Sequence, residues 1–457
     1  MMRAFELDEL KPVLGARLVG ENRTVERVVT DSRQLQPGDL FVALKGPNFD
    51  GHDFVGAAEL KGAAAVVVSQ VMDTRLPQLV VTDTLQALGQ LGGYNRSLFR
   101  GPVFAVTGSG GKTTVKEMLA RLLGSSGKVL ATRGNLNNEI GAPLTLLELS
   151  PEHDAAVIEL GASAQGEIAR TTAMTRPDVA VLNNAMGAHL EGFGSLEGVV
   201  RAKGEIFEGL PEGGVGVVNL DSPHAPAWIK RLQRLQRRMI SFGVENGAAD
   251  VGASGLEMNA DGSWRFVLDD GTEKLPVSLK LLGRHNVANA TAAAAAWVAA
   301  GRPLSKIAGI LDQCSPVAGR LSPHRLTTGA LVIDDSYNAN ADAVKAAIDL
   351  LAQLPGERVL VLGDMAELGN QSQQLHAEVG RYAAEREIDR LLVTGSAMRA
   401  AADAYAAVRQ GAEHFETQTQ LITRIQALPQ QQLTLLVKGS RSAGMDRVVA
   451  ALLKGDN

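Results

Sequence analysis

The feature that most constrains this chain is the glycine-dense turn TGSGGKTT at residues 107–114. It follows an apolar run, VFAV, and opens an amphipathic stretch, an order typical of a strand, a loop and a helix N-terminus. Glycines let backbone N–H groups converge on phosphate oxygens, Lys112 adds a full positive charge, and the Thr113 hydroxyl can ligate Mg²⁺. The turn therefore predicts a binding site for ATP or a related nucleotide.

The spacing departs from the usual G-x-x-x-x-G-K-[ST] pattern, which would place a glycine where this chain has Val106. An ordinary glycine turn can also join a strand to a helix. Such a turn does not explain a lysine and a threonine directly after a glycine pair. We expect the nucleotide to contact Thr107, Gly108, Ser109, Gly110, Gly111, Lys112, Thr113 and Thr114.

The bulk properties indicate a globular protein of several domains. A chain of 457 residues is too long for one compact core, and domain sizes favour about three units. A net charge of −5 gives no general attraction for nucleic acid or an acidic membrane, so we expect neither as a partner. The single cysteine, Cys314, excludes an internal disulfide and fits a reducing compartment. We expect a cytoplasmic protein that acts as a monomer.

The order of apolar runs predicts an α/β protein with three domains. Residues 1–100 form a small α/β domain, with a linker at 98–102. In residues 101–313, strands alternate with helices around the phosphate loop, which predicts a parallel sheet, and short strands at 238–282 form a hairpin insertion or a sheet edge. Alternation restarts in residues 314–457 and predicts a Rossmann-like, doubly wound sheet.

Acidic and basic residues after the phosphate loop indicate which reaction the chain could catalyse. Glu159 ends the apolar run AAVIE, beside the phosphate strand, where a carboxylate is well placed to hold Mg²⁺. His189 follows the strand-like run DVAVLNN, and a lone histidine there is more often a loop or core residue. Lys203 falls in a predicted helix, and its ammonium would repel a metal, so its charge alone indicates a surface residue.

Two further residues stand at the entry to the last domain. Arg320 lies in a loop, and Asp335 follows the apolar run ALVI as the second acid of DDSYNAN. An arginine can bind phosphates and a strand-end acid can bind ribose hydroxyls if this domain closes over the nucleotide. Without closure they are surface residues.

The order of these motifs resembles the Mur ligase family. The resemblance rests on TGSGGKTT, IELGA, HLEGFGS, AKGEIF, GRHNVANA, GRL and DDSYNAN, and extends to DSRQLQPGDLFVALKGPNFDGHDF and GNLNNEIGAPLTLL. It spans nearly the whole chain. GNLNN, HLEGFGS and DDSYNAN favour the branch that joins D-alanyl-D-alanine to UDP-N-acetylmuramoyl-tripeptide in peptidoglycan precursor synthesis.

The resemblance implies an ATP-dependent ligase that forms an acyl phosphate. Lys112, Glu159, His189 and Lys203 would be the catalytic residues. Thr113 and Glu159 would hold one Mg²⁺, and His189 would hold a second with Lys203 carbamylated by CO₂. Carbamylation would remove the charge objection, because it converts an ammonium into an anionic oxygen ligand.

The resemblance also assigns the remaining contacts. ATP would further contact Asn286, Asn289, Arg320 and Asp335. The UDP-sugar would contact Asp31, Ser32, Arg33, Lys45, Asn135, Asn137 and Asn138, although turn or loop chemistry also explains these residues. The acceptor would contact Ser336, Tyr337 and Asn338. Asn286 has a second interpretation as a helix cap.

Two other functions remain open. A sister ligase would share the central machinery but add a single amino acid to an earlier UDP-muramoyl peptide, or glutamate to folate. A non-catalytic nucleotide-binding homologue would keep the fold and lose metal and phosphate groups. The presence of Lys112, Glu159, His189 and Lys203 disfavours the second alternative.

Overall fold

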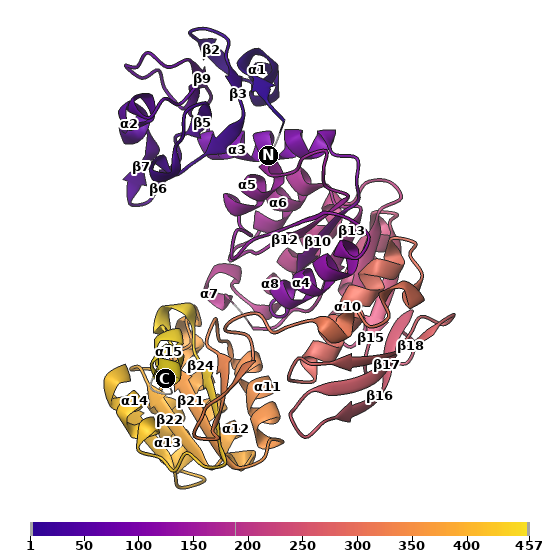
Figure 1. Ribbon diagram of the computed structural model, residues 1–457, viewed down its shortest axis with the longest axis vertical. Coiled ribbons are helices and arrows are strands. Elements are labelled where there is room, and N and C mark those ends of the chain that lie inside the picture. The colour runs from indigo at the N-terminus through magenta and orange to yellow at the C-terminus, as the bar shows by residue number, and fades with distance from the viewer. Residues whose placement is uncertain (1–2, 188, 455–457) are drawn as a thin grey trace.

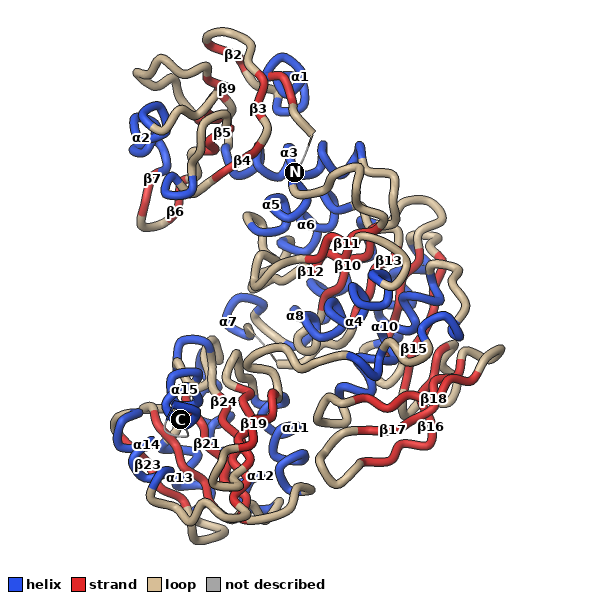
Figure 2. Tube along the Cα trace, viewed as in Figure 1, coloured by secondary structure: helices blue, strands red, loops and turns tan. Residues whose placement is uncertain are grey.

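The structure, a computed structural model, describes residues 3–187 and 189–454. Within these residues the strands form three main sheets, of five, nine and six strands, and two small two-stranded pairs. The three sheets follow one another along the chain as separate bodies, and helices pack on each (Figures 1 and 2). The expected α/β class is confirmed.

The N-terminal part is built on a small mixed sheet. Its strand order is β2-β9-β8-β5-β4, with β2 antiparallel to β9 and the other pairs parallel. The strands are β1 Phe5–Glu6, β2 Arg17–Val19, β3 Thr24–Val25, β4 Arg27–Val29, β5 Asp39–Val42, β6 Lys45–Gly46, β7 Phe49–Asp50, β8 Ala65–Val68 and β9 Gln78–Val80. The helices are α1 Leu7–Leu14, α2 Val55–Leu60 and α3 Thr84–Leu98.

The middle sheet has the order β11-β12-β10-β13-β14-β15-β16-β17-β18. Its strands are β10 Val103–Thr107, β11 Val129–Ala131, β12 Ala155–Glu159, β13 Val179–Leu182, β14 Val215–Asn219, β15 Arg238–Gly243, β16 Val251–Met258, β17 Trp264–Asp269 and β18 Lys274–Leu279. The helices are α4 Lys112–Gly124, α5 Gly141–Leu147, α6 Glu167–Thr175, α7 Leu190–Phe193, α8 Leu196–Gly204, α9 Ala225–Arg234 and α10 His285–Ala299. Pairing is parallel as far as β16, after which β17 and β18 continue antiparallel, so the segment at 238–282 extends the sheet edge.

The C-terminal sheet has the order β19-β20-β24-β21-β22-β23 and is parallel except for β19. Its strands are β19 Ser322–Arg325, β20 Leu331–Asp335, β21 Glu357–Gly363, β22 Arg390–Thr394, β23 Ala412–Phe415 and β24 Leu433–Lys438. Its helices are α11 Ala341–Ala352, α12 Ser372–Glu385, α13 Arg399–Ala406, α14 Gln418–Gln426 and α15 Asp446–Lys454. Buried residues lie on both faces of the sheet, as expected for a doubly wound arrangement.

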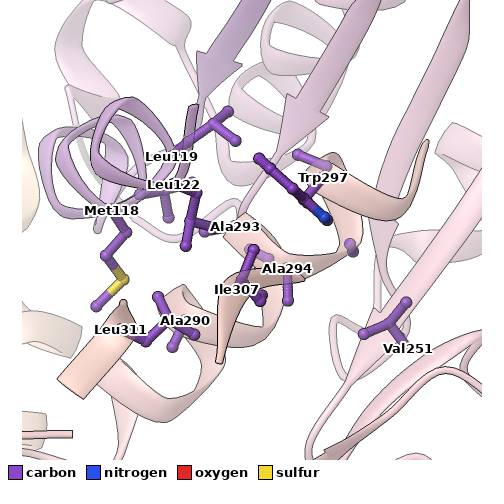
Figure 3. Close-up of a cluster of buried hydrophobic side chains, with 14 of the residues drawn as sticks. Met118, Leu119, Leu122, Val251, Ala290, Ala293, Ala294, Trp297, Ile307 and Leu311 are labelled. Atoms are coloured by element: carbon purple, nitrogen blue, oxygen red, sulfur yellow. The ribbon is translucent and has the colours of Figure 1, made fainter. Parts of the chain in front are cut away.

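The helix that starts at the phosphate loop is fixed by packing against α10. Met118, Leu119 and Leu122 of α4 meet an alanine-rich face of α10, where Ala290 and Ala293 lie (Figure 3). Small alanine side chains let the two helix backbones approach closely, and the leucines supply the buried apolar area. This packing holds the start of α4 beside the first turns of α10.

Helix α3 joins the N-terminal part to the middle part. Buried Arg96 donates hydrogen bonds to the carbonyl oxygens of Thr175 (2.9 Å) and Arg176 (2.9 Å), and buried Asn95 donates to those of Leu146 and Leu149. The expected linker at 98–102 is a short irregular connection after this helix.

We expect Arg96→Met to lower the free energy of unfolding by about 2–4 kcal/mol, because it leaves buried carbonyl groups without donors. Urea denaturation followed by circular dichroism measures the change. Arg100→Met, at an exposed position four residues on, is the matched control. Equal stability of the two variants would show that the Arg96 bonds do not hold the junction.

In the described ranges, no helix is both long enough and apolar enough to cross a membrane.

Candidate active site

A cavity of about 470 Å³ lies between the middle and C-terminal sheets. It opens at the carboxyl ends of β10, β12 and β13, where ligands bind in parallel α/β sheets. The predicted site residues that line it are Ser109, Gly110, Gly111, Lys112, Thr114, Asn135, Asn137, Asn138, Glu159, His189, Asn286, Asn289, Arg320, Asp335, Tyr337 and Asn338. Segments more than two hundred residues apart in the chain thus share one cavity.

The phosphate loop leads directly into α4. Gly111 is the N-cap and has a left-handed backbone with φ of 76°. A side chain is excluded there, since an added Cβ would lie 2.3 Å from the Asn289 side-chain oxygen. Because a glycine cap supplies no side-chain acceptor, the first N–H groups of α4 remain available to an anion.

Lys112 supplies the positive charge at this helix start. Its Nζ donates to the Gly108 carbonyl oxygen at 2.8 Å. Burial lowers the pKa of Lys112, nearby Glu159 opposes that shift, and Arg320 adds to it. Two cations and one carboxylate therefore converge at the end of the loop.

Asparagines behind the loop tie it to α10. Asn183 donates from Nδ2 to the Asn289 Oδ1 at 2.9 Å, and Asn289 donates in turn to Asn286 Oδ1 at 2.8 Å. Asn286 donates to the Leu282 carbonyl oxygen at 2.7 Å. Asn286 is not the helix cap, because the N-cap of α10 is Arg284. The capping interpretation is wrong, and both predicted asparagines line the cavity.

Glu159 has the geometry expected of a metal ligand. It is the last residue of β12 and is 2 % exposed. Its Oε1 accepts a hydrogen bond from Asn137 Nδ2 at 2.8 Å, and its backbone N–H donates to Thr132 Oγ1 at 2.9 Å. Its Oε2 is buried and has no hydrogen-bond partner among the described residues. A buried carboxylate oxygen without a partner is costly unless a cation or donor meets it, so this site fits Mg²⁺.

The surrounding side chains do not form a complete metal cage. No group of three or more His, Cys, Asp or Glu in the described part of the chain could hold a metal on its own. The Thr113 hydroxyl accepts a hydrogen bond from Arg320 Nη2 at 2.9 Å and lies behind the cavity wall. Mg²⁺ bound by one or two protein oxygens and by phosphate oxygens is the usual arrangement at nucleotide sites.

Lys203 is buried, so the interpretation as a surface charge is wrong. It is 2 % exposed, on α8, and its Nζ lies 3.2 Å from the Ala162 carbonyl oxygen and 5.2 Å from the centre of the Phe193 ring. Burial lowers its pKa to about 7, with a further lowering by Lys112. Helical periodicity could not reveal this burial, because it depends on the packing of α7 and α8.

His189 lies on the rim of the cavity. Its backbone is left-handed, with φ of 54°, at the N-cap of α7, and its ring packs edge-on to Phe193 at 6.4 Å between centres. Its Nδ1 contacts Glu367 Oε2 from the C-terminal part. His189 and Lys203 thus contact the same aromatic ring, although the structure does not bring the two into direct contact.

The C-terminal part forms a second wall of the cavity. The guanidinium of Arg320 lies 4.4 Å from the centre of the Tyr337 ring. Asp335 accepts a hydrogen bond from buried Lys438 at 2.7 Å, and Lys438 also donates to the Asn338 carbonyl oxygen at 2.8 Å. Lys438, which the sequence reasoning missed, ends a strand next to Asp335, so strand-end position is the signal that could have found it.

The remaining predicted residues fall outside the cavity lining. Thr107, Gly108 and Ser336 lie behind it, and Ser336 donates to Asp334 Oδ1 at 2.6 Å. Asp31, Ser32, Arg33 and Lys45 belong to the N-terminal part, and none of its described residues, from residue 3 onward, is in the lining. The ion pair of Asp31 with Arg33 at 2.7 Å holds the pKa of Asp31 at about 2. Of the predicted UDP-sugar set, only Asn135, Asn137 and Asn138 lie at the cavity.

We expect Arg320→Met to raise KM for ATP about tenfold with a smaller change in kcat, because a charge-assisted contact on the nucleotide side would be lost. Steady-state kinetics with varied ATP measures this. Arg325→Met, exposed on β19, removes the same charge away from the cavity and is the control. A lower kcat with unchanged KM would place Arg320 outside the nucleotide site.

Together, the fold and the cavity define an α/β protein with a phosphate loop, in which a second, mostly parallel sheet completes the cavity beside that loop. Residues 24–93 match the catalytic domain of the Mur ligase family, residues 106–297 the Mur ligase middle domain, and residues 319–441 the Mur ligase glutamate ligase domain. The chain belongs to the Mur ligase family.

Relatives match over nearly the full length. The UDP-N-acetylmuramoyl-tripeptide–D-alanyl-D-alanine ligase of Escherichia coli is 47% identical, with 99% of each chain covered. The ligase of the same name from Bacillus subtilis is 34% identical over 95% of this chain and 94% of its own.

Solved structures are also similar to this chain over nearly its full length. MurF from Acinetobacter baumannii has a TM-score of 0.93 at 36% identity, with 99% of each chain covered. MurF ligase from Thermotoga maritima, solved in complex with ADP, has a TM-score of 0.84 at 29% identity over 94% of this chain and 97% of its own.

Proposed function

We propose that this protein is an ATP-dependent ligase that joins D-alanyl-D-alanine to UDP-N-acetylmuramoyl-tripeptide and releases ADP and phosphate. The observation that carries the proposal is the buried Oε2 of Glu159, which has no hydrogen-bond partner in the described part of the chain and lies beside Lys112 and the uncapped start of α4. The names of the full-length relatives support the choice of substrates.

The chemistry needs an activated acid, because a carboxylate does not accept an amine at neutral pH. A carboxylate oxygen of the tripeptide attacks the γ-phosphorus of ATP, the bond to ADP breaks, and an acyl phosphate forms. The amine of the dipeptide then attacks the acyl carbon, the bond to phosphate breaks, and the amine gives up its proton. Both steps crowd anionic oxygens, which positive charge must offset.

Residues in the cavity lining and next to it would share this work. Lys112 and the start of α4 hold the phosphates, and Asn286, Asn289, Arg320 and Asp335 position the nucleotide. Thr113 and Glu159 would hold one Mg²⁺, and His189 would hold a second together with carbamylated Lys203. Bound Mg²⁺ supplies positive charge to the transferring phosphoryl group. Ser336, Tyr337 and Asn338 receive the dipeptide.

Lys203 serves as a carbamate in this proposal. An amine must be neutral to attack CO₂, and burial, which lowers the pKa of Lys203 to about 7, supports a neutral amine near physiological pH. Its position beside Phe193, which also meets His189, supports a shared role of the two residues.

Three substrates divided over three domains require domain movement. We assign residues 1–100 to the UDP-sugar, with Asp31, Ser32, Arg33 and Lys45 as contacts, 101–313 to ATP, and 314–457 to the dipeptide. The N-terminal contacts lie away from the cavity, so they reach the substrate only if that domain rotates inward. We place the enzyme in the cytoplasm, as a monomer.

An omission assay tests the proposal. Phosphate release is followed with ATP, Mg²⁺, UDP-N-acetylmuramoyl-tripeptide and D-alanyl-D-alanine, leaving out one component at a time, and the pentapeptide product is identified by mass. We expect release only with the complete mixture. Equal release with single amino acids in place of the dipeptide would indicate a sister ligase, and no release would indicate a non-catalytic homologue.

A further inference from the structure

Asn184 pairs with the phosphate loop through its side chain and its backbone. The Gly110 N–H donates to Asn184 Oδ1 at 2.8 Å, and Asn184 Nδ2 donates back to the Gly110 carbonyl oxygen at 3.2 Å. The Ser109 N–H donates to the Asn184 carbonyl oxygen at 3.1 Å. Asn184 therefore satisfies the N–H groups of Ser109 and Gly110, and it shares the Gly110 carbonyl oxygen with Asn183, whose Nδ2 donates to it at 3.0 Å.

The same segment makes two more bonds to the loop. Ser109 Oγ donates to the Met186 carbonyl oxygen at 3.1 Å, and the Met186 N–H donates to Ser109 Oγ at 2.9 Å. The loop also approaches closely, since a Cβ on Gly108 would lie 3.2 Å from the backbone of Asn184. These contacts join two segments that are more than seventy residues apart in sequence.

The pairing of Asn184 with the loop determines which backbone N–H groups of the loop can bind an anion. With the N–H groups of Ser109 and Gly110 directed at Asn184, those at the start of α4 remain for phosphate, next to Lys112. Beyond Met186, the segment reaches the C-terminal part, where the Gly187 N–H donates to Asp342 Oδ2 at 3.3 Å and His189 contacts Glu367.

We propose that Asn184 is a positioning residue that locks the phosphate loop to the segment carrying His189. It sets where the nucleotide phosphates bind relative to that histidine. The inference depends on the nucleotide-binding half of the proposed function and not on the identity of the peptide substrates.

Nucleotide binding tests the proposal directly. Binding of a fluorescent ADP analogue with Mg²⁺ is measured for the wild type, Asn184→Ala and Asn184→Asp. Aspartate keeps the shape of the side chain and an acceptor for Gly110, but it loses the donor. We expect the dissociation constant to rise about tenfold in both variants, which is the effect of losing one to two net hydrogen bonds. The Mg²⁺ concentration for half-maximal binding should also rise.

A matched control separates positioning from folding. Asn259→Ala removes an asparagine that donates to Ser263 Oγ at 2.8 Å in the β16–β17 turn, away from the cavity. We expect wild-type nucleotide binding in this control, and midpoints of thermal unfolding within a few degrees for all variants.

Two results would overturn the proposal: wild-type dissociation constants in both Asn184 variants, or a loss of folded protein whose remaining folded fraction binds as the wild type does. Because binding is measured without the peptide substrates, the result stands apart from the omission assay. A wild type that binds nucleotide but makes no product would refute the ligase function alone.

Discussion

Lys203→Ala is expected to lower kcat by at least about 10³-fold, while UDP-N-acetylmuramoyl-tripeptide still binds. The variant removes the amine that would become the carbamate ligand in the proposed mechanism, and it changes no residue of the cavity lining, because Lys203 is not part of that lining. Steady-state phosphate release measures the loss, and calorimetric titration with the UDP-substrate measures binding.

Chemical rescue distinguishes the carbamate from a purely structural lysine. Acetate or formate can occupy the space left by the truncated side chain and supply the missing carboxylate oxygens, so part of the activity should return. Lys230→Ala, exposed on α9, is the control and should be as active as the wild type. Normal turnover by Lys203→Ala would remove the carbamate from the mechanism.

Glu159→Gln should lower kcat by about 10²–10³-fold and raise the Mg²⁺ requirement, since a neutral amide is a weaker ligand for a divalent cation. Glutamine has the same shape and can still accept the Asn137 bond, so the change removes charge rather than packing. Turnover is measured over a range of Mg²⁺ concentrations.

The control for this variant is Glu212→Gln, an exposed position in the turn before β14. It should keep both the wild-type rate and the wild-type Mg²⁺ dependence. If Glu159→Gln kept the wild-type Mg²⁺ dependence, Glu159 would not be the metal ligand.

Much of the fold could be predicted from local patterns. The runs VFAVT and AAVIE are too apolar for exposed strands, and their alternation with helical stretches predicts a parallel sheet, as the structure confirms. Helix α3 and strand β23 are not marked by patterns of this kind. Helix α3 contains two adjacent glycines, and β23, with the sequence AEHF, lies half-buried at a sheet edge, so neither carries a strong periodic signal.

The candidate site could be predicted only in part, for a physical reason. The position at the end of a strand was enough to predict that Glu159 and Asp335 lie at the cavity. Parallel strands bring their carboxyl ends to one edge of a sheet. The burial of Lys203 and the pairing of Asn184 with Gly110 depend on contacts between distant segments, which no local pattern encodes. The separation of Asp31 from the cavity depends on how whole domains are arranged.

The measurement that tests the account most directly follows the oxygen of the reacting carboxylate. UDP-N-acetylmuramoyl-tripeptide labelled with ¹⁸O in that carboxylate is turned over with ATP and D-alanyl-D-alanine, and the released phosphate is analysed by mass. An acyl phosphate transfers one labelled oxygen to each phosphate released. Phosphate free of label, formed together with the product, would contradict the mechanism built on Lys112 and Glu159.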